Sequence, residues 1–260
     1  MLFLIFFEMK LPTFYTFFVI SSYLLIFSGC AFKRISRSKN ITYQQTELSN
    51  NSSKLELSVF APGKRADLNE VLIFIHGGSW NSGKKSLYNF FGSRMARKNV
   101  VVVTIDYPLS PKANYHQMAV AVVKAVEWVK KNIETFGGNP ERIFISGHSA
   151  GGHLAALVTL RNQYFDSLGM SSPIKGIILI DAAGLDMFGY LQEEKFPEDH
   201  TYLKTFTKNP ISWKDASPLY HLHHNMPPML IYRGEKTYPS IFKSHQKFIK
   251  ALKEYAPDTE

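Results

Sequence analysis

The sequence predicts an α/β protein with a mostly parallel sheet flanked by helices. Short, continuously apolar segments alternate with longer segments whose apolar residues recur at helical spacing. Strands buried on both faces have the first pattern and amphipathic helices have the second, so the alternation indicates repeated βαβ units. A length of 260 residues and a hydrophobic content of 45% suit one folded domain of ordinary size.

The predicted elements follow one another along the chain. Alternating polarity predicts a half-buried strand over residues 54–60. Apolar runs predict buried strands over 71–75, 100–105, 142–146, 175–180 and 229–232. Helical spacing predicts helices over 86–98, 116–135, 150–160 and 240–255. Residues 184–224 interrupt the alternation, and we expect this aromatic-rich insertion to cover the site as a cap.

The first thirty residues have the pattern of a targeting signal. Residues 11–28 carry no charge and follow Lys10. They lead into Ser28-Gly29-Cys30, which resembles a bacterial lipobox, where small residues precede a cysteine that receives lipid. Phe27 departs from that pattern, because leucine is usual at this position. An uncleaved transmembrane anchor and an ordinary cleaved signal peptide are the alternatives.

This signal sets the expected domain organisation. Residues 1–30 form the lipoprotein signal peptide, polar residues 31–52 form a flexible tether, and residues 53–260 form the folded domain. Lipid on Cys30 would anchor the protein to a membrane. We therefore expect a membrane-anchored lipoprotein of the bacterial cell envelope that faces the periplasm or the exterior.

The net charge of +9 is spread along the chain, as expected for a lysine-rich solvated surface. One basic cluster, Lys33–Lys39, follows the apolar segment directly, and we expect it to lie near lipid headgroups. No nucleic-acid-binding motif accompanies the charge, so the sequence predicts no nucleic-acid partner.

One serine lies between a predicted buried strand and a predicted helix. The surrounding sequence is Gly147-His148-Ser149-Ala150-Gly151. In a strand–turn–helix context, this pattern is typical of a nucleophile elbow, which projects the serine hydroxyl above the edge of the sheet. We predict that Ser149 is the catalytic nucleophile; a tight turn without chemistry is the alternative.

A second loop, His76-Gly77-Gly78-Ser79-Trp80, follows the strand predicted over 71–75. Adjacent glycines let backbone N–H groups converge on one point, as an oxyanion requires. We expect Gly77 and Gly78, together with the backbone N–H of Ala150, to form an oxyanion hole. His76 is expected to orient the loop.

The two loops, with residues 106–111 and 138–154, resemble the α/β-hydrolase fold esterases. Within them the chain is most similar to the carboxylesterase and kynurenine-formamidase-like group with an HGG oxyanion loop. The resemblance covers residues 55–255. It implies the α/β-hydrolase fold, a Ser-His-Asp triad, no metal, no cofactor, and hydrolysis of a small-molecule carboxylic ester or amide.

The chain departs from this pattern at the acid and the base. The acid is expected three residues after Gly234, where this sequence has Thr237. Asp181, directly after the strand predicted over 175–180, is therefore the tentative acid, and Asp186 is the alternative.

No histidine stands at the position that the family uses for the base. That position follows a further strand beyond 240–255, and the sequence printed here stops at Glu260. We therefore expect a fold that lacks the last strand, or a catalytically impaired relative that binds a ligand or a partner. His245 is expected to pack on the apolar side of its helix. The weaker candidates for the base are His221, His223 and His224.

Overall fold

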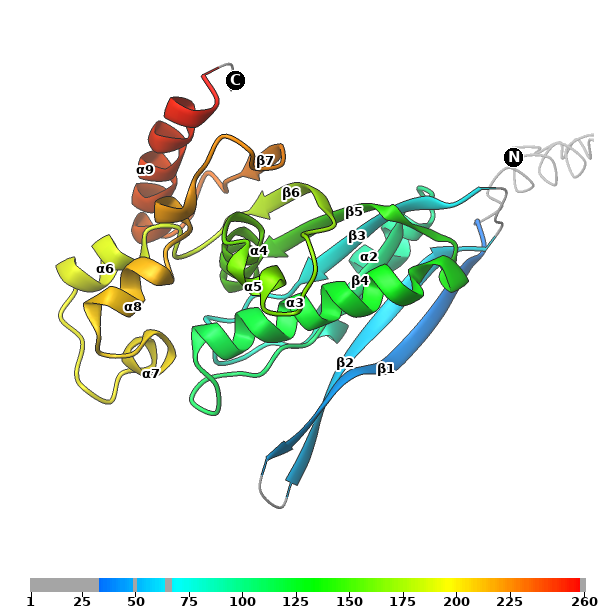
Figure 1. Cartoon of the computed structure of the whole chain (residues 1–260), viewed down its shortest axis with the longest axis horizontal. Helices are drawn as coiled ribbons and strands as arrows, with labels where there is room; N and C mark the ends of the chain where they lie inside the picture. The colour runs from blue at the N-terminus through cyan, green and yellow to red at the C-terminus, as the bar shows by residue number, and fades with distance from the viewer. Residues whose placement is uncertain (1–32, 49–50, 64–66, 258–260) are drawn as a thin grey trace, which may run out of the picture. The chain divides into compact units, whose positions relative to one another are not determined.

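Seven strands form one sheet in the order β1-β2-β4-β3-β5-β6-β7 in the computed structural model (Figure 1). The structure describes residues 33–48, 51–63 and 67–257, without the side chains of 46–48 and 51–53. Antiparallel pairs join β1 to β2 and β2 to β4, and all other pairs are parallel. The strands are β1 Ile35–Leu48, β2 Asn51–Pro62, β3 Asn69–Ile75, β4 Val101–Ile105, β5 Gly138–His148, β6 Ile174–Ile180 and β7 Met229–Tyr232.

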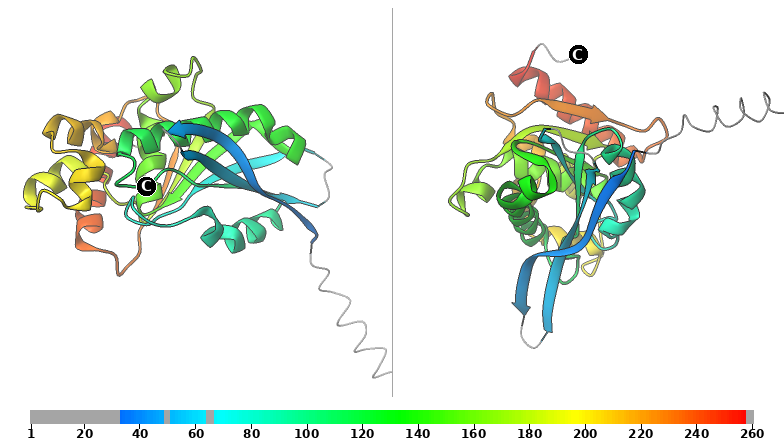
Figure 2. Two further views of the ribbon diagram at one scale, coloured as in Figure 1. Left: turned by 90° about the horizontal axis from the view of Figure 1, so that it is seen from below. Right: turned by 90° about the vertical axis from the view of Figure 1, so that its right-hand side faces the viewer.

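Helices cover both faces of the sheet, as Figure 2 shows. Alternate residues of β3 divide between two cores: Ile73 belongs to the larger core, to which α3, α4 and α9 also contribute residues, whereas Phe74 belongs to a smaller core with Ala96 of α2. This division explains why β3 has a continuous apolar run, since both of its faces are buried. The helices are η1 Lys85–Tyr88, α2 Asn89–Ala96, α3 Tyr115–Asn132, η2 Ile133–Phe136, α4 Ala150–Leu160, α5 Gln163–Asp166 and α9 Pro239–Tyr255.

The structure confirms the predicted fold class. The helix predicted over 150–160 spans Ala150–Leu160, and the strand predicted over 71–75 lies within β3. The helix predicted over 86–98 is divided into η1 and α2. The predicted insertion contains four short helices: α6 Met187–Glu193, α7 Thr201–Phe206, α8 Pro210–Asp215 and η3 Pro218–His221.

The flexible tether predicted over residues 31–52 was wrong for the residues of β1. This strand pairs with β2 from Ile35 opposite Pro62 to Leu48 opposite Asn51. The Tyr43 hydroxyl also donates a 2.6 Å hydrogen bond to the Asp106 carbonyl oxygen. Strand pairing uses backbone hydrogen bonds and does not require apolar side chains. A strand rich in Ser, Asn and Gln therefore cannot be distinguished from a linker by its composition.

The predicted targeting signal lies outside the part of the chain that the structure describes. Residues 11–28 and Cys30 are outside the described residues. Within residues 33–48, 51–63 and 67–257, no helix is long and apolar enough to cross a bilayer.

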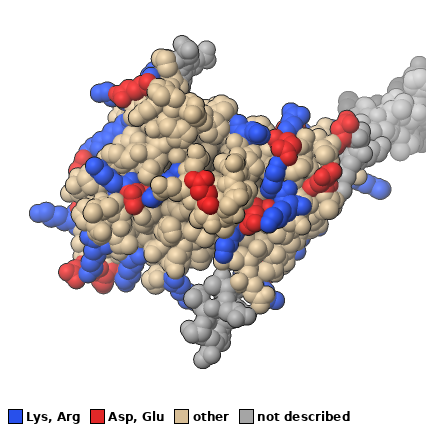
Figure 3. All heavy atoms as spheres, in the orientation of Figure 1, with Lys and Arg blue, Asp and Glu red and all other residues tan. Residues whose placement is uncertain are grey.

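Positive and negative side chains are interspersed on the face of the domain in Figure 3. Ion pairs among the described residues include Arg142 with Glu70 and Lys130 with Glu141. The net positive charge is therefore not gathered on this face.

Candidate active site

Ser149 lies at the sharp turn between β5 and α4, with φ 53° and ψ −118°. This left-handed backbone conformation is costly for a serine, and such strain concentrates at functional sites. A Cβ atom on Gly147 would lie 2.2 Å from the Gly151 carbonyl oxygen, and one on Gly151 would lie 2.2 Å from that of Ile75. Only glycine fits either position, so these contacts hold the turn.

The neighbouring strand fixes the backbone on both sides of the serine. The Ser149 N–H donates to the Ile180 carbonyl oxygen at 3.0 Å, and the Ser149 carbonyl oxygen accepts from the Ala183 N–H at 3.1 Å. The Ser149 side chain is half-buried. Within the described part of the chain, no hydrogen bond engages its hydroxyl. Ser149 therefore has a fixed backbone and an available oxygen.

The loop after β3 lies directly against this turn. A Cβ atom on Gly77 would lie 3.2 Å from the Ser149 Cβ. Gly78 has φ 131°, and Ser79 and Trp80 also have positive φ values. Ala150 is the first residue of α4. The structure thus brings together the four residues predicted for the nucleophile and the oxyanion hole.

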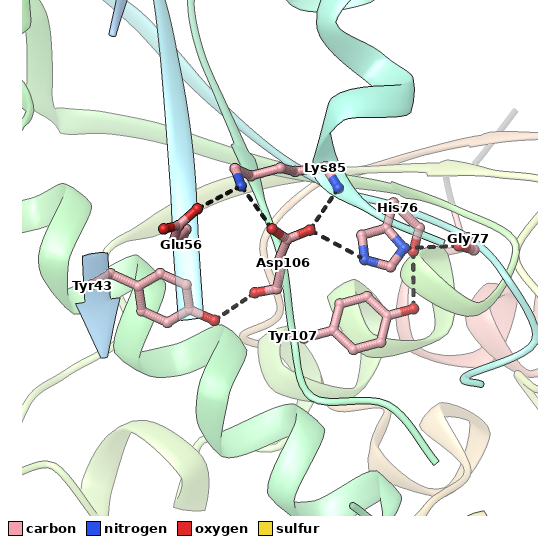
Figure 4. A network of polar contacts seen from close by, with 7 residues as sticks. All are labelled: Tyr43, Glu56, His76, Gly77, Lys85, Asp106 and Tyr107. Carbon is pink, nitrogen blue, oxygen red and sulfur yellow. Dashed lines mark hydrogen bonds and ion pairs between the residues drawn. The ribbon is translucent and has the colours of Figure 1, made fainter. Parts of the chain in front are cut away.

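His76 orients this loop through its ring, as Figure 4 shows. The ring is buried, stacks on Tyr107 with 4.4 Å between centroids, and donates from Nδ1 to the Gly77 carbonyl oxygen at 2.8 Å. The Tyr107 hydroxyl donates to the His76 carbonyl oxygen at 3.1 Å. Burial lowers the pKa of His76, so its neutral form is favoured.

The far end of the same loop is held by a partly buried ion pair. The Lys85 ammonium donates to Asp106 at 2.8 Å and to Glu56 at 3.2 Å, and the Lys85 backbone N–H donates to Asp106 at 2.7 Å. Burial alone would lower the pKa of Lys85, but these two carboxylates raise it, so the lysine stays charged. Asp106, which directly follows β4, therefore ties the end of the loop at Lys85 to the sheet. The sequence analysis assigned Lys85 no role.

Asp181, the tentative acid, also has a positive φ, 49°, directly after β6. Its carboxylate accepts from the Gly234 N–H at 3.1 Å and from the Thr237 hydroxyl at 2.9 Å. The side chain that replaces the expected acid therefore holds a carboxylate from the neighbouring strand. The alternative, Asp186, accepts from the Gly189 N–H and pairs with Lys247, so its carboxylate is engaged at the start of α6.

None of the candidate histidines is hydrogen-bonded to Ser149. His245 is fully buried, as predicted, and donates from Nε2 to the Ala182 carbonyl oxygen at 2.8 Å; burial lowers its pKa. His221 and His224 bond to carbonyl oxygens of Asp215 and Tyr255. Among the described residues, no hydrogen bond joins the Ser149 hydroxyl to an imidazole, and no cluster of three or more His, Cys, Asp or Glu could hold a metal ion.

A histidine that the sequence analysis passed over joins three parts of the site. His153, on α4, accepts from the Trp80 indole N–H at 3.2 Å and donates to the Ala216 carbonyl oxygen at 2.7 Å. The Trp80 ring also packs against Phe206 of the insertion. His153 thus connects the elbow helix, the glycine loop and the insertion.

A family model, BD-FAE, matches residues 57–248. The chain belongs to the BD-FAE family. BD-FAE is a family of α/β-hydrolase esterases. The match spans both glycine-containing loops, β6 and β7.

Curated relatives of this chain carry esterase names. Esterase LipQ of Mycobacterium tuberculosis is 34% identical over 68% of this chain and 43% of its own length. Esterase LipC of the same organism is 28% identical over 70% and 48%. Isoprenylcysteine alpha-carbonyl methylesterase ICME of Arabidopsis thaliana is 28% identical over 75% and 49%. The chain spans about half the length of these relatives.

Solved structures share the fold. Esterase B from Lactobacillus rhamnosis has a TM-score of 0.70 and 19% identity, and covers 93% of this chain and 82% of its own. Esterase 2 of Thermogutta terrifontis has a TM-score of 0.68 and 24% identity, over 87% and 79%. These likenesses establish the α/β-hydrolase fold.

We predict that His153 makes the domain less stable in mild acid. Burial lowers the pKa of His153 to about 4, against 6.5 in the unfolded chain. Between these pH values the unfolded state takes up a proton that the folded state does not, so stability falls as the pH drops from 6.5 toward 4. The difference corresponds to about 3 kcal/mol.

Urea unfolding of the wild type and of His153→Gln from pH 7 to pH 4.5 measures this effect. Glutamine can keep both hydrogen bonds without titrating, so the variant should lose less stability over this range. Equal pH dependence in the two proteins would contradict the assignment.

Proposed function

We propose that this chain hydrolyses carboxylic esters through nucleophilic attack by Ser149. The observation that carries the proposal is the left-handed turn that presents a Ser149 hydroxyl free of intramolecular hydrogen bonds among the described residues, beside Gly77. A mere loop gains nothing from this backbone strain, whereas a nucleophile needs the exposed oxygen. The relatives named as esterases support the same chemistry.

The proposed reaction has two steps. The Ser149 oxygen adds to the ester carbonyl carbon, the carbon–oxygen bond to the alcohol breaks, and the alcohol leaves with one proton. Water then cleaves the acyl–Ser149 ester and restores the hydroxyl. Backbone N–H groups of Gly77, Gly78 and Ala150 would stabilise the negative oxygen in both steps.

The rate of ester hydrolysis depends on removal of the proton from the Ser149 hydroxyl. Asp181 is the carboxylate that would orient a base, but among the described residues no hydrogen bond joins an imidazole to the serine hydroxyl. A serine hydrolase that lacks one triad member still keeps a rate about 10³ to 10⁴ times that in water. We therefore expect slow turnover that an external base accelerates.

Release of p-nitrophenol from a short p-nitrophenyl ester tests this function. Ser149-dependent turnover should be present, and added imidazole should increase it because imidazole can accept the Ser149 proton. Ser149→Ala should retain only the imidazole background, whereas Ser240→Ala, a change at an exposed serine of α9, should behave as the wild type. Equal turnover in Ser149→Ala and the wild type would contradict the proposal.

We also propose that Cys30 carries lipid and anchors the protein in the bacterial cell envelope. The support is the uncharged segment 11–28, the small residues Ser28 and Gly29, and the basic cluster that follows. A clickable fatty-acid analogue fed to expressing bacteria should label the wild type but not Cys30→Ser. Labelling that persists in Cys30→Ser would rule out this lipid site.

A further inference from the structure

The sheet face that carries α2 exposes two large apolar side chains to water. Leu87, on η1, is 65% exposed, and Phe90, on α2, is 74% exposed. The next residue, Phe91, instead packs on Phe74 of β3. Leu87 and Phe90 lie three residues apart in consecutive helical segments, so both exposed apolar side chains belong to one short stretch of the chain.

A hollow of about 320 Å³ lies beside Phe90. Three cationic side chains line it: Arg37 and Lys39 from β1 and Arg97 from the residue after α2. Arg37 donates from Nε to the Ser93 hydroxyl at 3.2 Å, which fixes the base of the hollow. Strand β1 and helix α2 thus bring together charges that are sixty residues apart in the sequence.

The charged side chains that line this hollow are all cationic. No Asp or Glu occurs from Val71 to Ile105 or from Lys33 to Thr46. In the part of the chain that the structure describes, no carboxylate forms an ion pair with Arg37 or Lys39.

We propose that this surface binds an anionic phospholipid membrane. The phosphate of a headgroup lies in the hollow between Arg37, Lys39 and Arg97, and Leu87 and Phe90 enter the interface beside it. Cations next to exposed apolar side chains match the charged headgroups and apolar interior of a bilayer surface. A nucleic acid would use the cations but leave both apolar side chains in water. The proposal does not depend on the hydrolytic function.

A fluorescent probe at position 90 tests this contact in the full chain. Cys30 is the sole cysteine, so Cys30→Ser with Phe90→Cys provides one labelling position for a polarity-sensitive dye. The apolar N-terminal segment can attach the protein to any vesicle, so the readout is the emission of the dye and not binding itself. A matched control carries the dye at an exposed position of α9 through Glu254→Cys.

With phosphatidylglycerol vesicles, the dye at position 90 should shift to the blue, whereas with phosphatidylcholine vesicles it should not. The dye at position 254 should stay unchanged with both. Adding Arg37→Ser and Lys39→Ser should lower the equilibrium constant for docking, measured as the ratio of shifted to unshifted dye, about 25-fold. Each cation near an anionic surface contributes about fivefold to this constant. Arg37→Lys, which keeps the charge, should preserve the shift and so controls for damage to β1.

Three results would overturn the proposal. The first is an equal shift with phosphatidylcholine, and the second is a full shift after both cations are removed. The third is the same shift with a DNA duplex in place of lipid, which would assign the cations to nucleic acid.

Discussion

The site depends on the close backbone contact between the elbow and the end of β3. The Gly151 backbone lies against the Ile75 carbonyl oxygen, and Gly147 lies against Gly151, so no side chain fits at either glycine. This contact forces the intervening turn, and Ser149 takes a left-handed conformation that a serine otherwise avoids. The tightly packed core around α4 compensates for the strain, because every residue of that helix is buried.

Polar contacts then position the loops around the elbow. The Asp106–Lys85 pair and the His76 ring hold the two ends of the glycine loop, and His153 ties that loop to the insertion. The loops are therefore arranged before any substrate arrives, which is what electrostatic stabilisation of an oxyanion needs.

Much of this arrangement could be predicted from the sequence, because apolar periodicity and turn residues are local signals. The strands from β2 to β7, the helices α3, α4 and α9, and the two glycine-containing loops belong to this class. Strand β1 was missed because its residues are polar and its pairing with β2 is invisible in composition. Lys85 was missed for a similar reason, since its partners Glu56 and Asp106 are distant in sequence and it resembles any surface lysine.

The loop after β7, which contains Gly234 and Thr237, keeps a carboxylate beside it although it lacks the expected acid. Thr237 stands where an acid was expected, yet its hydroxyl donates to Asp181, so a carboxylate still lies beside that loop. The pairing of β6 with β7 brings Asp181 and Thr237 together. The sequence around either residue does not predict this contact. This carboxylate, Ser149 and the glycine loop are the residues on which the proposed hydrolysis depends.

Covalent labelling with a fluorophosphonate, followed by mass spectrometry of the peptides, tests the nucleophile most directly. We predict one adduct, on Ser149, that forms faster when imidazole is added and is absent in Ser149→Ala. An adduct on another residue, or labelling that survives Ser149→Ala, would contradict the assignment of Ser149 as the nucleophile.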